Sequence, residues 1–146
     1  MHLMQLTSFT DYSLRVLIYL ALYQNKTCNV DEIVSSFSLS KNHIIKVVHN
    51  LVKLGYVKST RGRGGGLKLA RSPAKINIGK IVESVEPNFF IAECFNKESN
   101  YCKISPSCNL KKLLNEAQGS FLDTLYKSSL ENLIENKENS LKKLLS

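Results

Sequence analysis

Three of the four cysteines of this 146-residue chain lie close together, in the stretch ECFNKESNYCKISPSCNLKK. Seven residues separate Cys94 from Cys102, and five separate Cys102 from Cys108. Structural zinc sites usually contain cysteine pairs with about two to four residues between them, and this stretch has no such pair. Three thiolates on one loop instead suit an iron–sulfur cluster, because the iron of such clusters prefers soft sulfur ligands. A cluster of this kind needs a fourth ligand.

The fourth cysteine, Cys28, is the obvious additional ligand by chemistry, but it stands alone between two predicted helices. The role of a small, partly buried side chain is simpler for a cysteine in that position. The histidines are His2, His43 and His49, all distant in sequence from the cysteine stretch. A zinc site therefore stays open as an alternative without a supporting motif, and Cys28 is the less favoured cluster ligand.

The rest of the chain indicates a cytoplasmic protein without a membrane partner. Its longest apolar run, VLIYLALY, is too short to span a bilayer and predicts a buried helix. The opening MHLMQLTSFTD lacks the basic and apolar regions of a signal peptide. Structural disulfides are disfavoured in the cytoplasm, so clustered cysteines there indicate a metal, a cluster or redox chemistry.

The net charge of +8 is concentrated in one part of the chain. Residues 29–75 carry nine Lys and Arg residues against only Asp31 and Glu32, whereas residues 76–146 carry nine residues of each sign. Charge that served solubility alone would be spread more evenly. Such a basic block is typical of a surface that meets a polyanion, and it predicts binding to nucleic acid.

The basic block also contains the order of elements of a winged helix-turn-helix. Apolar residues recur with helical spacing over residues 9–23, 30–37 and 41–54. Two alternating segments, residues 56–60 and 67–71, flank the glycine-rich RGRGGG and predict a hairpin. The candidate helix caps are Ser8 or Thr10, Asn29, Ser40 and Gly55. We therefore expect a mainly α fold with a small β-hairpin wing.

In a winged helix-turn-helix the third helix enters the major groove, with its N-terminal residues nearest the base edges. Asn42 has the donor and acceptor pair that suits adenine, and Lys41 and Lys46 suit phosphates. For His43 a solvated surface position is at least as plausible as a contact. The residues of this helix expected to face mainly inward are Ile44, Ile45, Val47, Val48, Leu51 and Val52.

The wing adds two arginines on a glycine turn that can approach the duplex closely. Arg63, near the tip, suits a narrow minor groove. A nucleotide-binding loop is excluded, because RGRGGG has no GK[ST] ending and joins two strands. No catalytic constellation appears in the sequence, so an enzyme is not expected. The predicted DNA-contacting residues are Ser40, Lys41, Asn42, His43, Lys46, Arg61 and Arg63.

The C-terminal half predicts a short helix in IGKIVESVE, a loop that carries the cysteines, and one long helix. The apolar stripe of the long helix cannot cover itself, so we expect a partner helix from a second copy, with packing back on the N-terminal part as the alternative. We expect three regions: a DNA-binding domain in residues 1–75, a connecting helix and cysteine loop in residues 76–108, and a dimerisation helix and tail in residues 109–146.

From Met4 to about Leu145 the chain resembles the nitric-oxide-sensitive iron–sulfur repressors of the Rrf-two family of winged-helix bacterial regulators. The segments that carry the resemblance are MQLTSFTDYSLRVLIYLA, SKNHIIKVVHNLVKLGYV, RGRGGGLKL, IGKIVESVEP and the cysteine loop followed by CNLKKLL. The resemblance implies a homodimer with crossing C-terminal helices on an inverted-repeat, double-stranded operator. It also implies a [4Fe–4S] cluster on the three loop cysteines, with a [2Fe–2S] cluster as the alternative.

The resemblance further implies that the fourth ligand is an aspartate of the partner subunit, which in this sequence is Asp11. A hard carboxylate matches cluster iron poorly, so nitric oxide could attack there first. Asp11 also has plainer roles, in a capping box with Ser8 and in an i,i+4 pair with Arg15. Arg15 would hold Asp11 when no cluster is bound, and would thereby couple the cluster to DNA binding.

Two departures from the family pattern matter. The spacing between Cys94 and Cys102 is longer than usual, which indicates a small loop insertion. Lys111 stands where the related iron–sulfur assembly regulator has a histidine, which favours the nitric-oxide branch.

We therefore predict a transcriptional repressor that leaves its operator when its cluster is nitrosylated. The alternatives are a thiol-based or iron- or redox-sensing regulator of the same family and, less favoured, an iron–sulfur electron carrier, which would not need a basic surface.

Overall fold

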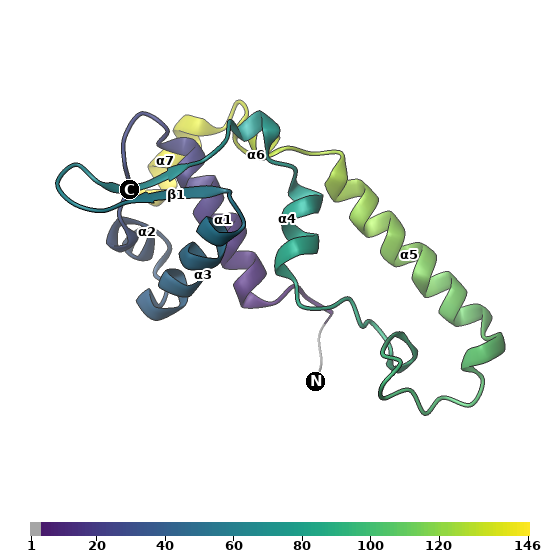
Figure 1. The fold of residues 1–146 in the computed structure, drawn as a ribbon. Coiled ribbons are helices and arrows are strands. Elements are labelled where there is room, and N and C mark those ends of the chain that lie inside the picture. Colours follow the sequence, from purple (N-terminus) through teal and green to yellow (C-terminus); the bar gives the residue numbers. More distant parts are fainter. Residues whose placement is uncertain (1–3) are drawn as a thin grey trace.

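The computed structural model describes residues 4–146, and residues 1–3, which include His2, lie outside the described part. Most of this part is helical, with one two-stranded antiparallel sheet (Figure 1), so the predicted fold class is confirmed. Its helices and strands are α1 (Ser8–Leu22), α2 (Val30–Phe37), α3 (Lys41–Lys53), β1 (Val57–Thr60), β2 (Gly66–Leu69), α4 (Ile78–Val85), α5 (Asn109–Tyr126), α6 (Leu130–Ile134) and α7 (Glu138–Leu145). Short 3-10 turns cover Pro73–Lys75, Glu93–Phe95 and Ser105–Ser107.

Two of the predicted helix ends form as the local chemistry requires. α2 begins with a capping box, in which the Asn29 side chain accepts a hydrogen bond from the Glu32 amide and the Glu32 carboxylate accepts one from the Asn29 amide. After α3 the chain turns through Gly55, whose φ of +83° suits glycine. Ser40 occupies the N-cap position of α3 but makes no capping hydrogen bond with its side chain.

The start of α1 differs from the prediction. The N-cap is Thr7, whose Oγ1 accepts a hydrogen bond from the amide of Thr10 at 3.3 Å, so the assignment to Ser8 or Thr10 is wrong. The capping box of Ser8 with Asp11 is wrong for the same reason. Asp11 is the fourth residue of α1, and its amide already donates to the carbonyl of Thr7 at 3.0 Å. The Asp11 carboxylate therefore takes no part in capping α1.

The wing is an antiparallel hairpin in which Val57 pairs with Leu69 and Thr60 with Gly66. Its turn depends on Gly65, because a Cβ atom there would lie 2.3 Å from the carbonyl oxygen of Thr60. The backbone of Cys28 pairs with Leu67 of β2, with N–O distances of 2.9 and 2.6 Å. The segment before α2 thus ties the wing to the helical part.

One core joins the N-terminal helices to the C-terminal part of the chain. It is built on α1, α3 and α4, and it includes Leu130 of α6, which is fully buried and donates its amide to the carbonyl of Ile76 at 2.8 Å. The division into regions at residues 75 and 108 stays a prediction, while this core takes residues from both sides of both boundaries. None of the helices in residues 4–146 is long and apolar enough to cross a membrane.

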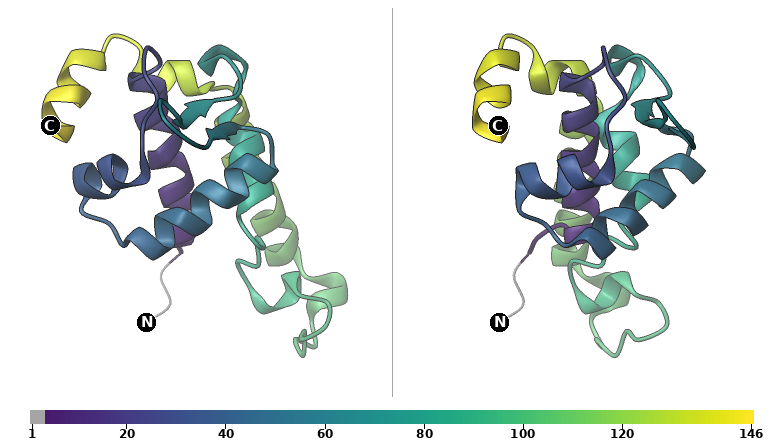
Figure 2. Two further views of the ribbon diagram at one scale, coloured as in Figure 1. Left: turned by 60° about the vertical axis from the view of Figure 1, so that its left-hand side comes forward. Right: turned by 90° about the vertical axis from the view of Figure 1, so that its left-hand side faces the viewer.

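α5 stands apart from this core. It leaves the body of the molecule near the top of α4 and carries the cysteine loop at its far end (Figures 1 and 2). It has no buried residue, and Leu113 is 60% exposed. The predicted long helix is confirmed, and part of its apolar stripe, including Leu110, Leu113 and Phe121, is left exposed within the single chain.

The last turn of α5 is held against α4 by a close contact between Gly79 and Tyr126. A Cβ atom at Gly79 would lie 2.6 Å from the Tyr126 ring and 2.8 Å from its backbone nitrogen. The side-chain amide of Asn77 donates to the carbonyl of Tyr126 at 2.7 Å, and the hydroxyl group of Tyr126 hydrogen-bonds to Glu83. α4 therefore holds the last turn of α5 through both backbone and side chain.

We expect Gly79→Ala to lower the free energy of unfolding by about 1–3 kcal/mol, because the added methyl group must displace Tyr126. Urea denaturation followed by circular dichroism measures this change. Lys80→Ala, at the exposed neighbouring position, is the matched control and should change the stability by less than about 0.5 kcal/mol. Equal stabilities of the two variants would mean that α4 and α5 are not locked together in solution.

Candidate DNA-binding surface and cysteine loop

α3 presents one apolar face to the core and one polar face to solvent. Ile44, Val47 and Leu51 are fully buried, whereas all the predicted contact residues of this helix and its cap are exposed. Ile45 is 46% exposed, so the prediction that it faces inward is wrong. Residues three and four apart share a helix face, which places Ile45 beside the two residues at the start of the helix, Lys41 and Asn42.

Lys41 has a partner within the chain that the sequence analysis did not foresee. Its Nζ lies 2.7 Å from Oδ1 of Asp31 in the first turn of α2, and both side chains are exposed. The pair links the two helices of the helix-turn-helix across their connection. Exposed ion pairs are worth only about 0–1 kcal/mol, so a DNA phosphate can take the place of Asp31.

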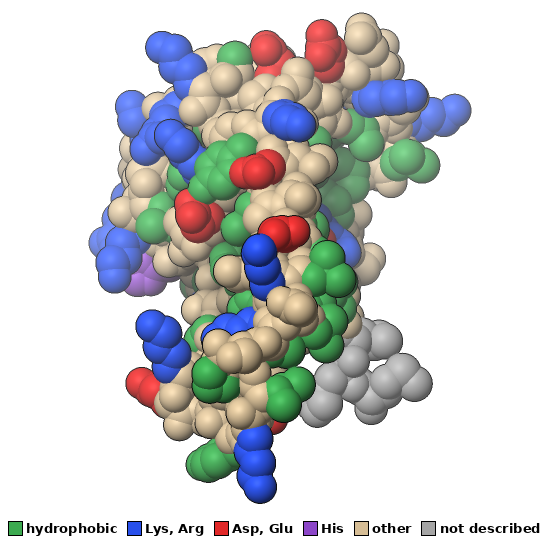
Figure 3. Space-filling view, turned by 90° about the vertical axis from the view of Figure 1, so that its right-hand side faces the viewer, with side chains coloured by type: hydrophobic (Ala, Val, Ile, Leu, Met, Phe, Trp, Pro, Cys, Tyr) green, Lys and Arg blue, Asp and Glu red, His purple; other side chains and the backbone are tan. Residues whose placement is uncertain are grey.

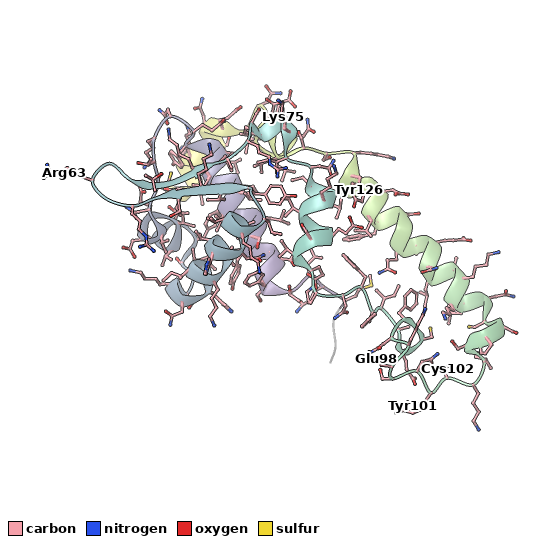
Figure 4. All side chains as sticks on the ribbon, viewed as in Figure 1. Arg63, Lys75, Glu98, Tyr101, Cys102 and Tyr126 are labelled. Atoms are coloured by element: carbon pink, nitrogen blue, oxygen red, sulfur yellow. The ribbon has the colours of Figure 1, made fainter. Side chains whose placement is uncertain are left out.

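The wing holds its two arginines away from the rest of the chain. Arg61 and Arg63 are exposed, and Arg63 lies at the tip of the hairpin (Figure 4). Cys102 lies at the opposite end of the molecule (Figure 4). Any communication between the wing and the cysteine loop within one chain therefore runs through the helices between them.

The three loop cysteines are free thiols in different surroundings. Cys94 is half-buried in a 3-10 turn, and Cys102 is exposed. Cys108 is the N-cap of α5, where its sulfur accepts a hydrogen bond from the amide of Lys111 at 3.4 Å. Within residues 4–146 the structure does not gather three cysteine, histidine or acidic side chains into a group that could hold a metal. The three thiols therefore lie on one loop but are not close enough together to form a metal site.

The chemistry of these donors fits an iron–sulfur cluster. The thiols are soft ligands, and among the described residues no disulfide engages them. Three cysteines leave one coordination position for another residue, as the sequence analysis expects.

Cys28 has different surroundings from the loop cysteines. Its side chain is only 1% exposed, and its backbone is paired with β2. Burial raises the pKa of the Cys28 thiol, so the neutral thiol is the favoured form. This is the environment of a packed core residue, in keeping with the simpler of its two roles.

The cysteine loop starts from a glutamate that is fixed to the first turn of α1. Glu86 follows α4 directly, and its carboxylate accepts hydrogen bonds from the amide and hydroxyl of Thr7, each at 3.1 Å. It also accepts one from the hydroxyl of the fully buried Thr10, at 2.5 Å. The role of Glu86 was not predicted from the sequence, because a glutamate at a helix end before a proline carries no signal of a partner so distant along the chain.

Asp11 follows this turn and forms the predicted pair with Arg15. The Nε and Nη2 atoms of Arg15 donate to the two carboxylate oxygens of Asp11 at 3.1 and 2.7 Å. The side chain of Arg15 is 40% exposed and that of Asp11 is 43% exposed. A pair of this exposure is worth at most about 1 kcal/mol, so a competing ligand can break it at low cost. The role of Asp11 as a ligand for a partner subunit stays a prediction.

We expect alkylation of the native chain to distinguish Cys28 from the loop cysteines. Iodoacetamide should modify Cys102 first and Cys94 and Cys108 next, while Cys28 reacts only after unfolding, because it is buried and protonated. Mass spectrometry of peptides from a time course, with and without urea, measures the order. Modification of Cys28 in urea-free buffer at the rate of Cys102 would contradict the packing of Cys28 beneath the wing.

Comparison with known proteins agrees with this architecture. Residues 6–136 match the family model described as Rrf2, iron-dependent transcriptional regulator. The chain is 48% identical over 144 residues to the HTH-type transcriptional regulator NsrR of Bacillus licheniformis, covering 98% of this chain and 100% of that protein. It is 49% identical over 142 residues to NsrR of Bacillus subtilis, covering 97% of each.

Solved structures with lower identity show the same fold. T. potens IscR has a TM-score of 0.72 at 21% identity, over 94% of this chain and 90% of that one. CymR, the global cysteine regulator of B. subtilis, has a TM-score of 0.69 at 24% identity, over 92% of this chain and 99% of that one. The predicted family and the prediction of a regulator rather than an enzyme are confirmed. The chain belongs to the Rrf2 (Rrf-two) family of transcriptional regulators.

Proposed function

We propose that this chain is a cytoplasmic, homodimeric repressor that senses nitric oxide through an iron–sulfur cluster and binds an inverted-repeat operator. One observation carries the proposal. The hydrogen bonds from Thr7 and Thr10 to Glu86 join the start of the cysteine loop to the first turn of α1, which leads directly to Asp11. The start of the loop is thus hydrogen-bonded to the first helix of the reading unit.

Cys94, Cys102 and Cys108 would hold the cluster, in the [4Fe–4S] form that the family resemblance implies. When bound, such a cluster supplies iron that nitric oxide can attack at its one carboxylate-ligated position. Asp11 of the partner subunit would be that carboxylate. Its pair with Arg15 is half-exposed and weak, so Asp11 can exchange one partner for the other. Arg15 would recover Asp11 when the other partner is lost.

The exposed face of α5 supports the homodimer. Hydrophobic side chains gather on the face formed by α5 and the cysteine loop (Figure 3), and Leu110, Leu113 and Phe121 are among the large exposed apolar residues. Large apolar side chains exposed along one helix indicate an interface. A second copy would cover it with the same stripe, and the resulting two-fold symmetry would require an operator with two inverted half-sites.

The DNA contacts would come from α3 and the wing. Lys41, Lys46 and Arg61 would meet phosphates, and Asn42 would read an adenine edge. Ser40 and His43 would lie at the same groove edge, at the start of α3. The exposed Ile45 adds an apolar contact that suits the methyl group of thymine.

We expect protein purified without oxygen to contain iron and sulfide, and Ala variants of Cys94, Cys102 or Cys108 to contain neither. Cys28→Ala is the matched control and should keep the cluster, because Cys28 lies in the core. Nitric oxide should bleach the visible absorbance in step with release of an inverted-repeat operator in gel shifts. Iron-free protein that binds the operator and ignores nitric oxide would favour thiol chemistry at the three cysteines.

We expect Arg63→Ala to weaken operator binding and to lower the slope of log affinity against log salt by about one unit, if Arg63 neutralises a phosphate. Fluorescence anisotropy across a salt series measures both quantities. Lys97→Ala removes one positive charge from the exposed cysteine loop, at the other end of the molecule, and should leave the slope unchanged. An unchanged slope with reduced affinity in Arg63→Ala would place Arg63 on base edges in the minor groove.

A further inference from the structure

Arg15 lies between an aromatic ring of α1 and one of α2. Its guanidinium carbon is 5.6 Å from the centre of the Tyr12 ring on α1 and 5.9 Å from that of Phe37, the last residue of α2. Both distances lie within the range of cation–π attraction. The bidentate pair with Asp11 fixes the plane of the same guanidinium. The position of Arg15 between the two rings therefore depends on whether Asp11 holds it.

Tyr12 extends this arrangement to the reading helix. Its ring meets that of His43 edge to face, with centroids 5.6 Å apart and an interplanar angle of 73°. Such T-shaped pairs are a favoured aromatic geometry. His43 lies in the first turn of α3 and is exposed on the face predicted to meet DNA. One half-buried ring thus contacts the Asp11–Arg15 pair on one side and the start of the reading helix on the other.

The second ring beside Arg15 leads to the same helix. Phe37 ends α2, and α2 is tied to α3 by the ion pair between Asp31 and Lys41. A displacement of Arg15 would therefore act on α2 and α3 together. Both routes end on a predicted DNA-contacting side chain, Lys41 or His43, but the route through Tyr12 is shorter because its ring itself contacts His43.

We propose that Tyr12 is a positioning residue that transmits the state of the Asp11–Arg15 pair to His43 and the first turn of α3. While Asp11 holds Arg15, the guanidinium stays against the Tyr12 ring and the ring supports His43. When Asp11 is drawn to another ligand, Arg15 loses its anchor, and the Tyr12 ring and His43 move with it. The inference rests on the proposed function, which supplies the other ligand, but the link itself belongs to this chain alone.

The link can be tested in the full-length protein, prepared with a chelator so that no iron is present. Asp11→Asn breaks the ion pair and stands in for an Asp11 that is engaged elsewhere. The ring C–H signals of His43 in carbon-13 NMR spectra should then shift, whereas those of His49, near the other end of α3, should not. In Tyr12→Leu protein the same Asp11→Asn change should leave His43 nearly unmoved. Tyr12→Phe is the matched control, because it keeps the ring, and should behave as the parent chain.

The Asp11→Asn and Tyr12→Leu variants form a double-mutant cycle, and operator affinity gives a second measurement of it. Asp11→Asn should change the affinity of the iron-free protein by about fivefold or more, and this factor should fall to about one when Tyr12 is Leu. If Tyr12→Leu does not fold, His43→Gln removes the other ring and should abolish the effect of Asp11→Asn in the same way. Equal effects of Asp11→Asn with and without these rings would overturn the proposal.

The outcomes separate this inference from the proposed function. The double-mutant cycle is measured without iron and without nitric oxide. It therefore reports on the link from the Asp11–Arg15 pair to His43, whatever the cysteines bind. If the parent protein carries a cluster but keeps its DNA bound in nitric oxide, the proposed function is wrong and the link is unaffected. If nitric oxide releases DNA from the parent protein and from the Tyr12→Leu variant to the same extent, only the proposed link is wrong.

Discussion

The organisation of this protein depends on one carboxylate, that of Glu86, which accepts three hydrogen bonds at 2.5–3.1 Å from the first turn of α1. Hydrogen bonds to a charged acceptor are the stronger kind, and Thr10 is fully buried among them. The contact fixes where the cysteine loop leaves the core, and it fixes the same turn of α1 from which Asp11 projects. It anchors the start of the cysteine loop to the N-terminal helices, while the contact between Gly79 and Tyr126 anchors the other end of α5.

The structure combines this firm contact with a weak one directly beside it. The Asp11–Arg15 pair is half-exposed and can be broken for about 1 kcal/mol or less, while the Glu86 contact holds its surroundings in place. Such a combination suits a sensor, because the part that exchanges partners must be cheap to move and the part that transmits the change must be rigid. Arg15, the basic member of the weak pair, lies between the Tyr12 and Phe37 rings.

Local signals in the sequence predicted correctly those elements whose ends depend on neighbouring residues. Asn29 and Glu32 cap α2, and Gly55 follows α3, because each of these contacts spans only a few residues. The predictions failed where a distant partner intervened. Thr7 caps α1 in place of Ser8 because Glu86 holds Thr7 from 79 residues away, and Ile45 is exposed because the core covers a narrower face of α3 than periodicity implies.

By itself the sequence determined the winged-helix architecture, the basic reading surface, the three cysteines on one loop and the family, since these follow from residue types, spacing and similarity along the chain. Only the tertiary structure decided which residues connect these parts. Glu86 meets Thr7, Tyr12 meets His43, and Gly79 meets Tyr126 because separate helices pack there, and no local pattern encodes such a meeting. Residue types and their spacing along the chain therefore indicate the chemistry, whereas the contacts between distant segments follow from how the helices pack.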